Sequence, residues 1–564
     1  MSLAGDPTLA RLAGALGAAA RDAGAPEGFE PELSRPRDRE HGDWASNAAL
    51  VLAGKLGRSP RDIAEAIVGA LDEGAAGVTD VTVAGPGFLN FRLANEGLWP
   101  QLARVLEVDS AWGRTATGAG RRVNVEFVSA NPTGPLHVAH GRGAALGDAV
   151  ASLLAWTGHE VSREFYVNDA GKQIRLLAES IEARYQQARG NDVAVPEGGY
   201  QGEYITDLAS EIGDRVGIES LDAMSRGDRL ARFEADAVEG LRAGQAADLA
   251  DFGVHMDAWF SETSLYESGA IDELLARLDG AELTYESDGA LWLRTSAFGD
   301  EKDRVLIKSD GSYTYFLPDL AYHLDKADRG FDLTIDVWGA DHQGHEKRML
   351  AALAGLGRPE LLEVLIIQLV TVMQGGEEAR MSKRAGRFVS LGDLVTETGP
   401  DVTRYFFLMR RAEVHLNFDL DLALDTSEAN PVYKIQYAHA RMCSVFARGE
   451  VDPETVDATL DGLEALETDA EREVARGVLR MPEVVAASAR ARAPHILCTY
   501  LEETAAAVNA WYHQGNLDPA LRMLAEGSAR EGRLKLARAV QITLRNGLRI
   551  LGLSAPETMV RETK

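Results

Sequence analysis

One stretch, residues 123–158, restricts the fold more than any other part of this 564-residue chain. It begins with apolar and polar residues in alternation, the period of a half-buried strand. Residues 131–135 contain two prolines and therefore extend neither a strand nor a helix. An Ala/Leu-rich helix is predicted over 136–158. His137 and His140 then lie on the first turn of a helix that follows a strand.

Such a helix start favours a bound phosphate, because free backbone N–H groups and the helix dipole point toward it. Two imidazoles on one face of that turn add hydrogen-bond donors. The pair taken alone is also compatible with simple packing residues. A zinc site fits less well, since the segment lacks the glutamate and the four-residue spacing of the protease pattern. A dinucleotide fingerprint fails at Leu146, where its third glycine belongs.

A short basic segment, residues 380–386 (RMSKRAG), lies far downstream. Together with the HxxH pattern, it resembles the second signature motif, KMSKS, of class I aminoacyl-tRNA synthetases. Longer segments are similar to the arginyl-tRNA synthetase family in particular: EFVSANPTGPLHVAHGRG, YVNDAGKQI, YTYFLPDLAYH, VWGADHQGHEKRM and MSKRAGRFV. The resemblance extends over nearly the whole chain.

Alternating strands and helices predict a multidomain α/β protein whose main sheet is parallel and doubly wound, with its ligand site at the carboxyl ends of the strands. Such a sheet is also the Rossmann-type fold that the resemblance implies. Further strands are expected at 161–167, 335–338 and 364–372, and hairpins at 285–293 and 305–316. Helices are expected at 203–216, 229–252, 270–278, 401–411 and 422–448.

The resemblance also implies a domain organisation. Residues 1–112 are expected to form a small α/β domain that contacts the outer corner of a tRNA. Residues 121–400 would be the catalytic domain, with an insertion at about 190–297. A connecting region, 401–425, would lead to a helical anticodon-binding domain at 426–564.

The net charge of −29 is unusual for a protein that binds nucleic acid. A tRNA partner requires local basic surface, and residues 518–564 carry nine Lys and Arg against five acids. The only cysteines, Cys443 and Cys498, favour reduced thiols in a cytoplasm. The charged N-terminal segment predicts an amphipathic helix, not a signal peptide, and the apolar run at 364–373 is too short to span a bilayer.

The resemblance implies a two-step reaction in which arginine attacks the α-phosphate of ATP and the arginyl group then passes to tRNA(Arg). ATP is a substrate, Mg²⁺ accompanies it, and the enzyme is expected to be a monomer. Arginine activation is expected to require bound tRNA. Adenylation depends mainly on alignment and on stabilising charge at the phosphate, so donors and a lysine serve it better than a nucleophilic side chain.

Site residues follow from the same resemblance, and no metal ligands are among them. His137, His140 and Lys383 are the expected catalytic residues. The expected ATP-binding set consists of Gly134, His137, His140, Gly141, Gly339, Asp341, Met381, Ser382 and Lys383. The expected arginine-binding set consists of Glu126, Ser129, Asn131, Tyr315, Asp319, Asp341 and His342. Asp319 is the expected guanidinium partner, because a planar five-donor cation fits a carboxylate in its plane; the alternative is that Asp319 only caps a helix.

Two positions depart from the family pattern. The third position of the first motif, normally glycine, is Ala139, whose methyl group is expected to weaken ATP binding. The lysine that opens the second motif is replaced by Arg380. A catalytically impaired tRNA-binding paralogue is therefore one alternative. Another class I synthetase, such as one for cysteine, is a second, although its zinc-binding thiols are absent.

Overall fold

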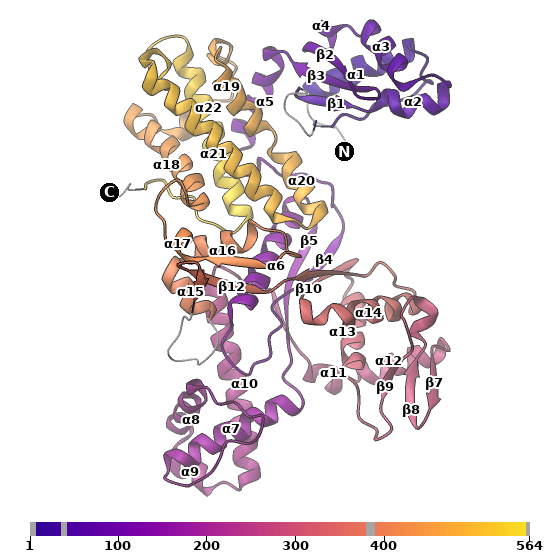
Figure 1. The fold of residues 1–564 in the computed structure, drawn as a ribbon, viewed down its shortest axis with the longest axis vertical. Coiled ribbons are helices and arrows are strands. Elements are labelled where there is room, and N and C mark those ends of the chain that lie inside the picture. The colour runs from indigo at the N-terminus through magenta and orange to yellow at the C-terminus, as the bar shows by residue number, and fades with distance from the viewer. Residues whose placement is uncertain (1–6, 35, 37–41, 380–389, 560–564) are drawn as a thin grey trace.

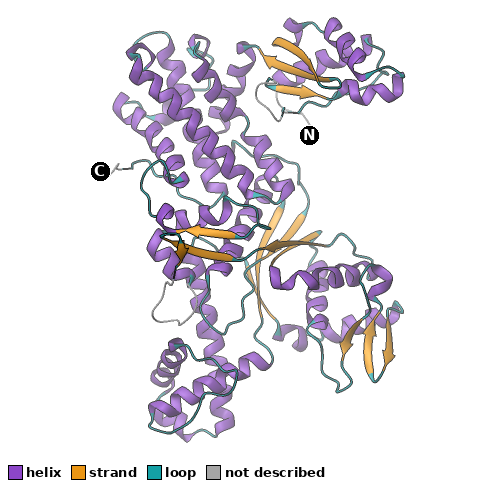
Figure 2. Ribbon diagram, viewed as in Figure 1, coloured by secondary structure: helices purple, strands orange, loops and turns teal. Residues whose placement is uncertain are grey.

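The structure is a computed structural model that describes residues 7–34, 36, 42–379 and 390–559. A parallel sheet occupies its centre, with a helical bundle on one side and two lobes on the other (Figure 1). A small N-terminal unit lies beside the far end of the bundle. Figure 2 shows that strands gather in the central sheet and in smaller peripheral sheets, while helices make up most of the rest. None of the described helices has the length and hydrophobicity needed to cross a bilayer.

The N-terminal unit packs helices on an antiparallel sheet of order β1-β3-β2. Its helix α3 begins as the sequence predicts, because Oγ of Ser59 accepts a hydrogen bond from the backbone N–H of Asp62 at 3.1 Å and Pro60 follows the cap. The elements are α1 (Pro7–Asp22), β1 (Trp44–Ser46), α2 (Ala48–Leu56), α3 (Pro60–Ala70), α4 (Glu73–Ala76), β2 (Val78–Ala84), β3 (Phe88–Leu93) and α5 (Asn95–Val108).

The central sheet is parallel throughout and has the order β11-β10-β4-β5-β6. From β4 the chain first adds β5 and β6 on one side of the sheet, and it later adds β10 and β11 on the other side. The strand order therefore reverses between β4 and β10. This confirms the doubly wound fold, and the reversal is where such sheets bind ligands. The elements are β4 (Arg122–Glu126), α6 (Val138–Trp156), β5 (Glu160–Val167), β6 (Ala258–Ser261), β10 (Leu333–Gly339), α14 (Gln343–Gly355) and β11 (Leu362–Ile367).

The connection from β5 to β6 is a helical module with its own apolar core around Phe233. It consists of α7 (Lys172–Ala188), α8 (Glu203–Val216), α9 (Ile218–Ala223) and α10 (Arg226–Asp251). We call α7–α10, residues 172–251, the helical module. The expected insertion at about 190–297 is therefore not continuous, because β6 rejoins the central sheet within it.

A second lobe connects β6 to β10. It consists of α11 (Thr263–Glu267), α12 (Ala270–Gly280), β7 (Thr284–Ser287), β8 (Ala290–Leu293), β9 (Arg304–Ile307) and α13 (Phe316–Asp328). The hairpin expected around Asp288-Gly289 is confirmed by β7 and β8. The hairpin expected over 305–316 is formed in part: the chain reverses at Asp310-Gly311, and hydrogen bonds join Lys308 to Ser312 and Thr314 to Leu306. Its second arm is only an isolated bridge from Tyr313 to Ile307, while β9 pairs with β8 as a strand. α13 already begins at Phe316.

Two other predicted elements are each divided in the structure. The strand predicted at 364–372 is β11 followed by β12 (Val370–Gln374), which pairs with β13 (Glu377–Glu378) and β14 (Leu416–Asp419) in a separate sheet. The helix predicted at 422–448 is α17 (Leu420–Ala423) followed by α18 (Pro431–Gly449). Asn430 interrupts it, since its amide nitrogen bonds the carbonyl groups of Ala423 and Asp425. In the chain, α15 (Leu391–Thr398) and α16 (Pro400–Leu408) come between β13 and β14.

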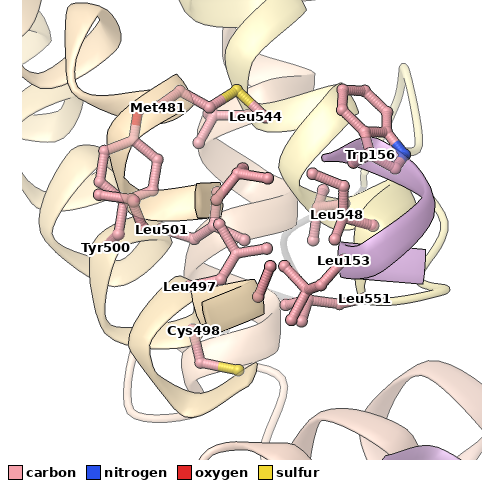
Figure 3. Close-up of a cluster of buried hydrophobic side chains, with 14 of the residues drawn as sticks. Leu153, Trp156, Met481, Leu497, Cys498, Tyr500, Leu501, Leu544, Leu548 and Leu551 are labelled. Atoms are coloured by element: carbon pink, nitrogen blue, oxygen red, sulfur yellow. The ribbon is translucent and has the colours of Figure 1, made fainter. Parts of the chain in front are cut away.

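The helical bundle packs directly on α6. It consists of α18, α19 (Asp469–Leu479), α20 (Met481–Ala491), α21 (Pro494–Leu517) and α22 (Ala529–Ile550). Figure 3 shows Leu153 and Trp156, near the end of α6, beside Leu497, Leu501 and Leu548 of the bundle. All five side chains are buried. With 19 residues, α6 is about 28 Å long and connects the predicted phosphate site to the bundle core.

Part of the basic charge of the C-terminal segment lies inside the fold and not on the surface that its composition predicts. Arg533 is buried and bonds Glu471, and Lys535 is buried and bonds Asp457 and Glu531. The charges of α22 are thus largely used inside the fold.

Three ion pairs connect the bundle to the N-terminal unit and its linker. Arg538 and Arg545 of α22 both contact the carboxylate of Asp109, which directly follows α5. Arg476 of α19 lies 2.6 Å from the buried carboxylate of Asp43. We call these contacts the Asp43–Asp109 seam.

Candidate active site

The first signature motif lies where the sequence predicts it, at the start of α6. His137 occupies the N-cap position, and its backbone N–H donates to Nδ1 of His140 at 3.3 Å. The two rings stack with centroids 3.7 Å apart. Because Nδ1 of His140 accepts this bond, the neutral ring carries its proton on Nε2 and presents that N–H as a donor.

Both imidazoles are neutral at physiological pH. Burial lowers the pKa of His137. Burial and then the neighbouring His137 lower the pKa of His140 to about 3. The pair therefore offers N–H donors to a phosphate without adding positive charge, so cationic stabilisation at this helix start has to come from another segment.

The second signature motif falls at 380–386, and the predicted residues Met381, Ser382 and Lys383 lie outside the described residues. The described chain resumes at Ser390, shortly after that segment. Ser390 forms an antiparallel bridge with His137, and the backbone N–H of Leu391 donates to the carbonyl group of Leu136 at 2.8 Å. An added Cβ at Gly141 would lie 2.5 Å from the Leu391 side chain, so this glycine allows α6 to approach α15 closely. The backbone at 390–391, shortly after the second signature segment in the sequence, thus lies at the first turn of α6.

The loop after β4 has a strained backbone. Val128 and Ser129 have φ angles of 72° and 39°, in the left-handed region that a β-branched residue rarely adopts. This conformation places Oγ of Ser129 within 2.8 Å of Oε1 of Glu126, to which it donates, and within 3.2 Å of the backbone N–H of Tyr166, from which it accepts. The strain therefore orients Ser129 toward the β4 carboxylate and β5.

Glu126 belongs to a row of three buried carboxylates that crosses the central sheet. It pairs in register with Asp336 of β10 and with Glu164 of β5, so all three side chains point to the same face. α13 covers this face. Lys326 of α13 donates to Glu126 at 2.6 Å and to Asp336 at 3.0 Å, and Arg329 forms a bidentate pair with Glu164.

Burial raises the pKa of Glu126, and the positive charge of Lys326 opposes this rise. Lys326 is itself fully buried; Asp336 and Glu126 together raise its pKa against the lowering effect of burial. The ion pairs thus keep a fixed set of charges beneath the carboxyl end of β4.

The expected guanidinium partner, Asp319, lies in the first turn of α13, where its Oδ2 is 3.0 Å from Nε2 of His345. Tyr315, immediately before α13, is 74% exposed. Asp341 and His342 lie together in the turn after β10, 3.4 Å apart, and both face solvent. Gly339 ends β10, and an added Cβ there would lie 2.5 Å from Asp341. The structure therefore places these residues at the start of α13 and in the turn after β10, and Asp319 connects the two elements through His345 of α14.

Sequence reasoning did not identify Glu262, which lies beside Asp319. Its side chain is buried and accepts a hydrogen bond from the hydroxyl group of Tyr266 at 3.1 Å. Burial raises the pKa of Glu262, and the charges of Asp319 and Asp169 raise it further. The sequence signal that could have identified Glu262 is its position directly after β6. It was missed because β6 itself was not predicted.

Asp169, two residues after β5, is close to the start of α7 but does not cap it. The helix is capped by Gly171. Asp169 instead accepts hydrogen bonds from the hydroxyl groups of Ser261 at 2.6 Å and Thr263 at 3.0 Å, which connects the ends of β5 and β6.

Comparison with known proteins agrees with this geometry. The family model described as "tRNA synthetases class I (R), catalytic domain" matches residues 101–406. An arginine–tRNA ligase of Bacillus licheniformis is 47% identical over 94% of this chain and 94% of its own length. The chain belongs to the arginyl-tRNA synthetase family.

Other comparisons extend this membership to the rest of the chain. An arginyl-tRNA synthetase N-terminal model matches residues 10–93, and a DALR anticodon-binding model matches 435–559. The arginine–tRNA ligase of Bacillus subtilis is 47% identical over 93% of this chain and 94% of its own length. The arginyl-tRNA synthetase structure from Thermus thermophilus superposes with a TM-score of 0.74 at 25% identity, covering 97% of this chain and 99% of the other.

The helical bundle of this arginyl-tRNA synthetase contains a polar cavity of about 540 Å³ between α18 and α21. Arg441 lies between two aromatic rings, 4.7 Å from the ring centroid of Tyr437 and 4.6 Å from that of Tyr512. Its guanidinium also donates to Asn509. Tyr437 is half-buried and lines the cavity. Aromatic rings and an arginine together are suited to stacking against bases.

Proposed function

We propose that this chain attaches L-arginine to tRNA(Arg) in two steps. The carboxylate of arginine attacks the α-phosphate of ATP, which gives arginyl-adenylate and releases pyrophosphate. A ribose hydroxyl of the tRNA end then takes the arginyl group and releases AMP. The observation that carries the proposal is the bridge between His137 and Ser390, which brings the backbone shortly after the second signature segment to the helix start that carries the first.

On the phosphate side, the start of α6 and Nε2–H of His140 supply neutral donors to the phosphates. Lys383, from the second signature segment, supplies the positive charge that the neutral imidazoles lack. Gly134, Gly141, Gly339 and Asp341 complete the proposed nucleotide site with Met381 and Ser382. No side chain has to act as a nucleophile, since the substrate carboxylate is the nucleophile.

On the arginine side, we assign the guanidinium to Asp319 and add Glu262 as a second carboxylate. Glu126, Ser129 and Asn131 hold the amino and carboxylate ends, with Tyr315, Asp341 and His342 nearby. Support comes from the charge distribution. The carboxylate row under α13 has its own cations, Lys326 and Arg329. At Glu262, by contrast, burial and the neighbouring acids raise the pKa. An incoming guanidinium would neutralise the acidic pair formed by Asp319 and Glu262.

Mg²⁺ belongs with the nucleotide in this proposal. The donors at α6 are imidazole and backbone N–H groups, which suit anions and not a hard cation. Within 7–34, 36, 42–379 and 390–559, no group of three or more His, Cys, Asp or Glu side chains is placed to hold a metal ion. Mg²⁺ commonly enters such sites on substrate phosphates and keeps most of its waters.

The same proposal assigns the remaining parts of the chain to the tRNA. Residues 1–112 contact its outer corner, 121–400 carry out catalysis, 401–425 connect, and 426–564 bind the anticodon through the cavity around Arg441. We propose a monomer in the cytoplasm, where the two free thiols, Cys443 and Cys498, would stay reduced. Light scattering during size-exclusion chromatography tests the oligomeric state.

Exchange of labelled pyrophosphate into ATP tests the function. With tRNA(Arg) present, we expect exchange with arginine and none with lysine or cysteine. Exchange without amino-acid preference would contradict the proposal. No exchange in the presence of tRNA, combined with retained tRNA binding, would instead support the impaired paralogue.

A further inference from the structure

The turn at 131–134 connects β4 to α6 and carries two proposed ligands, Asn131 and Gly134. Its backbone is held by side chains that the reaction itself does not use. Nε2 of Gln245 donates to the carbonyl groups of both Asn131 and Gly134, each at 3.1 Å. The hydroxyl group of Tyr204 donates to the carbonyl group of Thr133 at 2.8 Å. Both hydrogens of the Gln245 amide are thus used on this one turn.

All of these side chains come from the helical module. Tyr204 is on α8 and Gln245 is on α10. A third residue, Gln173 of α7, accepts a hydrogen bond from the side-chain amide of Asn131 at 2.7 Å. Gln245 is 2% exposed, so water does not readily replace its bonds. Burial raises the pKa of Tyr204 to about 12, so its hydroxyl group remains a donor at physiological pH.

α10 connects the module mechanically to the catalytic sheet. Phe233, near its start, belongs to the core of the helical module. Leu249 and Phe252, at its end, belong to the main core that contains α6 and the central sheet. Gln245 lies between these two contacts. A displacement of the helical module therefore acts on the turn that precedes His137.

We infer that Gln245 and Tyr204 are positioning residues through which the helical module holds the turn at 131–134 in the shape that binds ATP and arginine. This inference rests on the proposed function and deepens it. Neither side chain touches the reacting atoms. Their effect is to fix the distance between the arginine end of the site at Asn131 and the phosphate end at His137, and misplacement of this kind lowers the turnover rate.

The test compares Tyr204→Phe and Gln245→Met with Tyr185→Phe. The hydroxyl group of Tyr185 donates to Asp222 at 2.8 Å within the same module but away from the turn, so this matched control loses one buried hydroxyl group and no contact with the turn. In arginine-dependent pyrophosphate exchange at saturating tRNA, we expect kcat to fall about tenfold for Tyr204→Phe and by more for Gln245→Met, because one and two hydrogen bonds are lost. The control should keep kcat within about twofold.

Two further measurements separate positioning from general destabilisation. The melting temperatures of Tyr204→Phe and Tyr185→Phe should agree, and tRNA affinity should be unchanged in all variants. Wild-type kcat in both Tyr204→Phe and Gln245→Met would overturn the inference, as would activity lost in proportion to the fraction unfolded. Binding of a non-hydrolysable ATP analogue, measured by calorimetry, is a test that does not depend on arginine. The affinity for the analogue should fall in Tyr204→Phe and Gln245→Met and stay unchanged in Tyr185→Phe. Equal ATP-analogue affinity in all variants would overturn the inference even if the wild-type protein proved not to use arginine.

Discussion

Nζ of Lys326 lies 2.6 Å from Oε2 of Glu126, and the lysine side chain has no exposed surface. The two residues are 200 positions apart in the sequence. Because Lys326 also bonds Asp336, one cation serves two of the three carboxylates that cross the sheet. Glu126 and Asp336 therefore share a single cation of α13, while the third carboxylate, Glu164, pairs with Arg329.

Replacing Lys326 by Met should destabilise the fold in a pH-dependent way. Glu126 would lose the charge that opposes the effect of burial, so its pKa would rise further. A carboxyl group whose folded pKa is raised contributes stability while protonated, and that contribution is lost as pH rises through the folded pKa. We expect a loss of about 3–5 kcal/mol at pH 8.5 and a smaller loss at pH 5.5, measured by urea unfolding.

Lys347→Met is the matched control for this substitution. Lys347 is exposed and lies 3.5 Å from the exposed Glu301, so its loss should cost about 0–1 kcal/mol at either pH. An equal loss for Lys326→Met at both pH values would show that Glu126 does not take up a proton.

Substitution of the acidic pair should affect arginine binding selectively. Asp319→Asn and Glu262→Gln each remove one charge from the proposed guanidinium site, and we expect the KM for arginine to rise by about 100-fold or more. The KM for ATP should change little. Asp328→Asn, on the same helix but paired with Arg277 at the surface, should behave as wild type in steady-state exchange kinetics. An unchanged arginine KM for Asp319→Asn would refute the assignment of Asp319.

His140→Asn should lower the rate of adenylation by about 100- to 1000-fold, the usual effect of losing one oxyanion donor. It should also change the acid stability. The pKa of His140 is about 3, below its ordinary value because of burial. The stability that a neutral histidine provides is lost as pH falls from about 6.5 toward 3.

The variant should therefore lose less stability on acidification than the wild type, when melting temperatures are compared between pH 7.5 and 4.5. His255→Asn, an exposed position, should retain the wild-type slope and rate. Parallel slopes for all three proteins would show that His140 becomes charged in the folded state.

Ala139→Gly should improve ATP binding if the methyl group opposes the nucleotide, as the family pattern implies. We expect a lower KM for ATP and an unchanged KM for arginine in pyrophosphate exchange. A small decrease in stability, up to about 1 kcal/mol, accompanies glycine in a helix. An ATP KM that stays the same or rises would show that Ala139 does not restrict the site.

Arg441→Ala should raise the KM for tRNA in aminoacylation, because it removes the cation between Tyr437 and Tyr512. Base stacking of this kind contributes about 1–3 kcal/mol per base, which corresponds to roughly 5- to 150-fold in affinity. The KM values for arginine and ATP should not change. Arg490→Ala, an exposed arginine of the same bundle, is the control, and an equal effect of both variants would indicate only general charge attraction.

Local patterns predicted the start of α6, the position of the imidazole pair and most helices of the module, because capping and apolar periodicity are encoded within short segments. They did not predict β6, a four-residue strand whose place is set by pairing with β5. Without β6, the sequence offered no reason to select Glu262. The division of the predicted strand at 364–372 likewise depends on which sheet each half joins.

Composition was misleading for the C-terminal segment. Its excess of Lys and Arg predicted a surface for tRNA, yet Arg533, Lys535 and Arg538 are buried in ion pairs. Apart from Glu531, which also contacts Lys535, their acidic partners are distant in sequence, so the folded structure is needed to reveal these ion pairs.

The Asp43–Asp109 seam has a consequence for how a long, L-shaped nucleic acid would be read. Three ion pairs, formed by Asp43 before α5 and Asp109 after it, join the N-terminal unit and its linker to α19 and α22. These ion pairs thereby fix the distance between the N-terminal unit and the cavity at Arg441, so the protein and not a bound RNA sets that distance. A transfer RNA with one base pair too many in the intervening stem would reach one of these surfaces and miss the other.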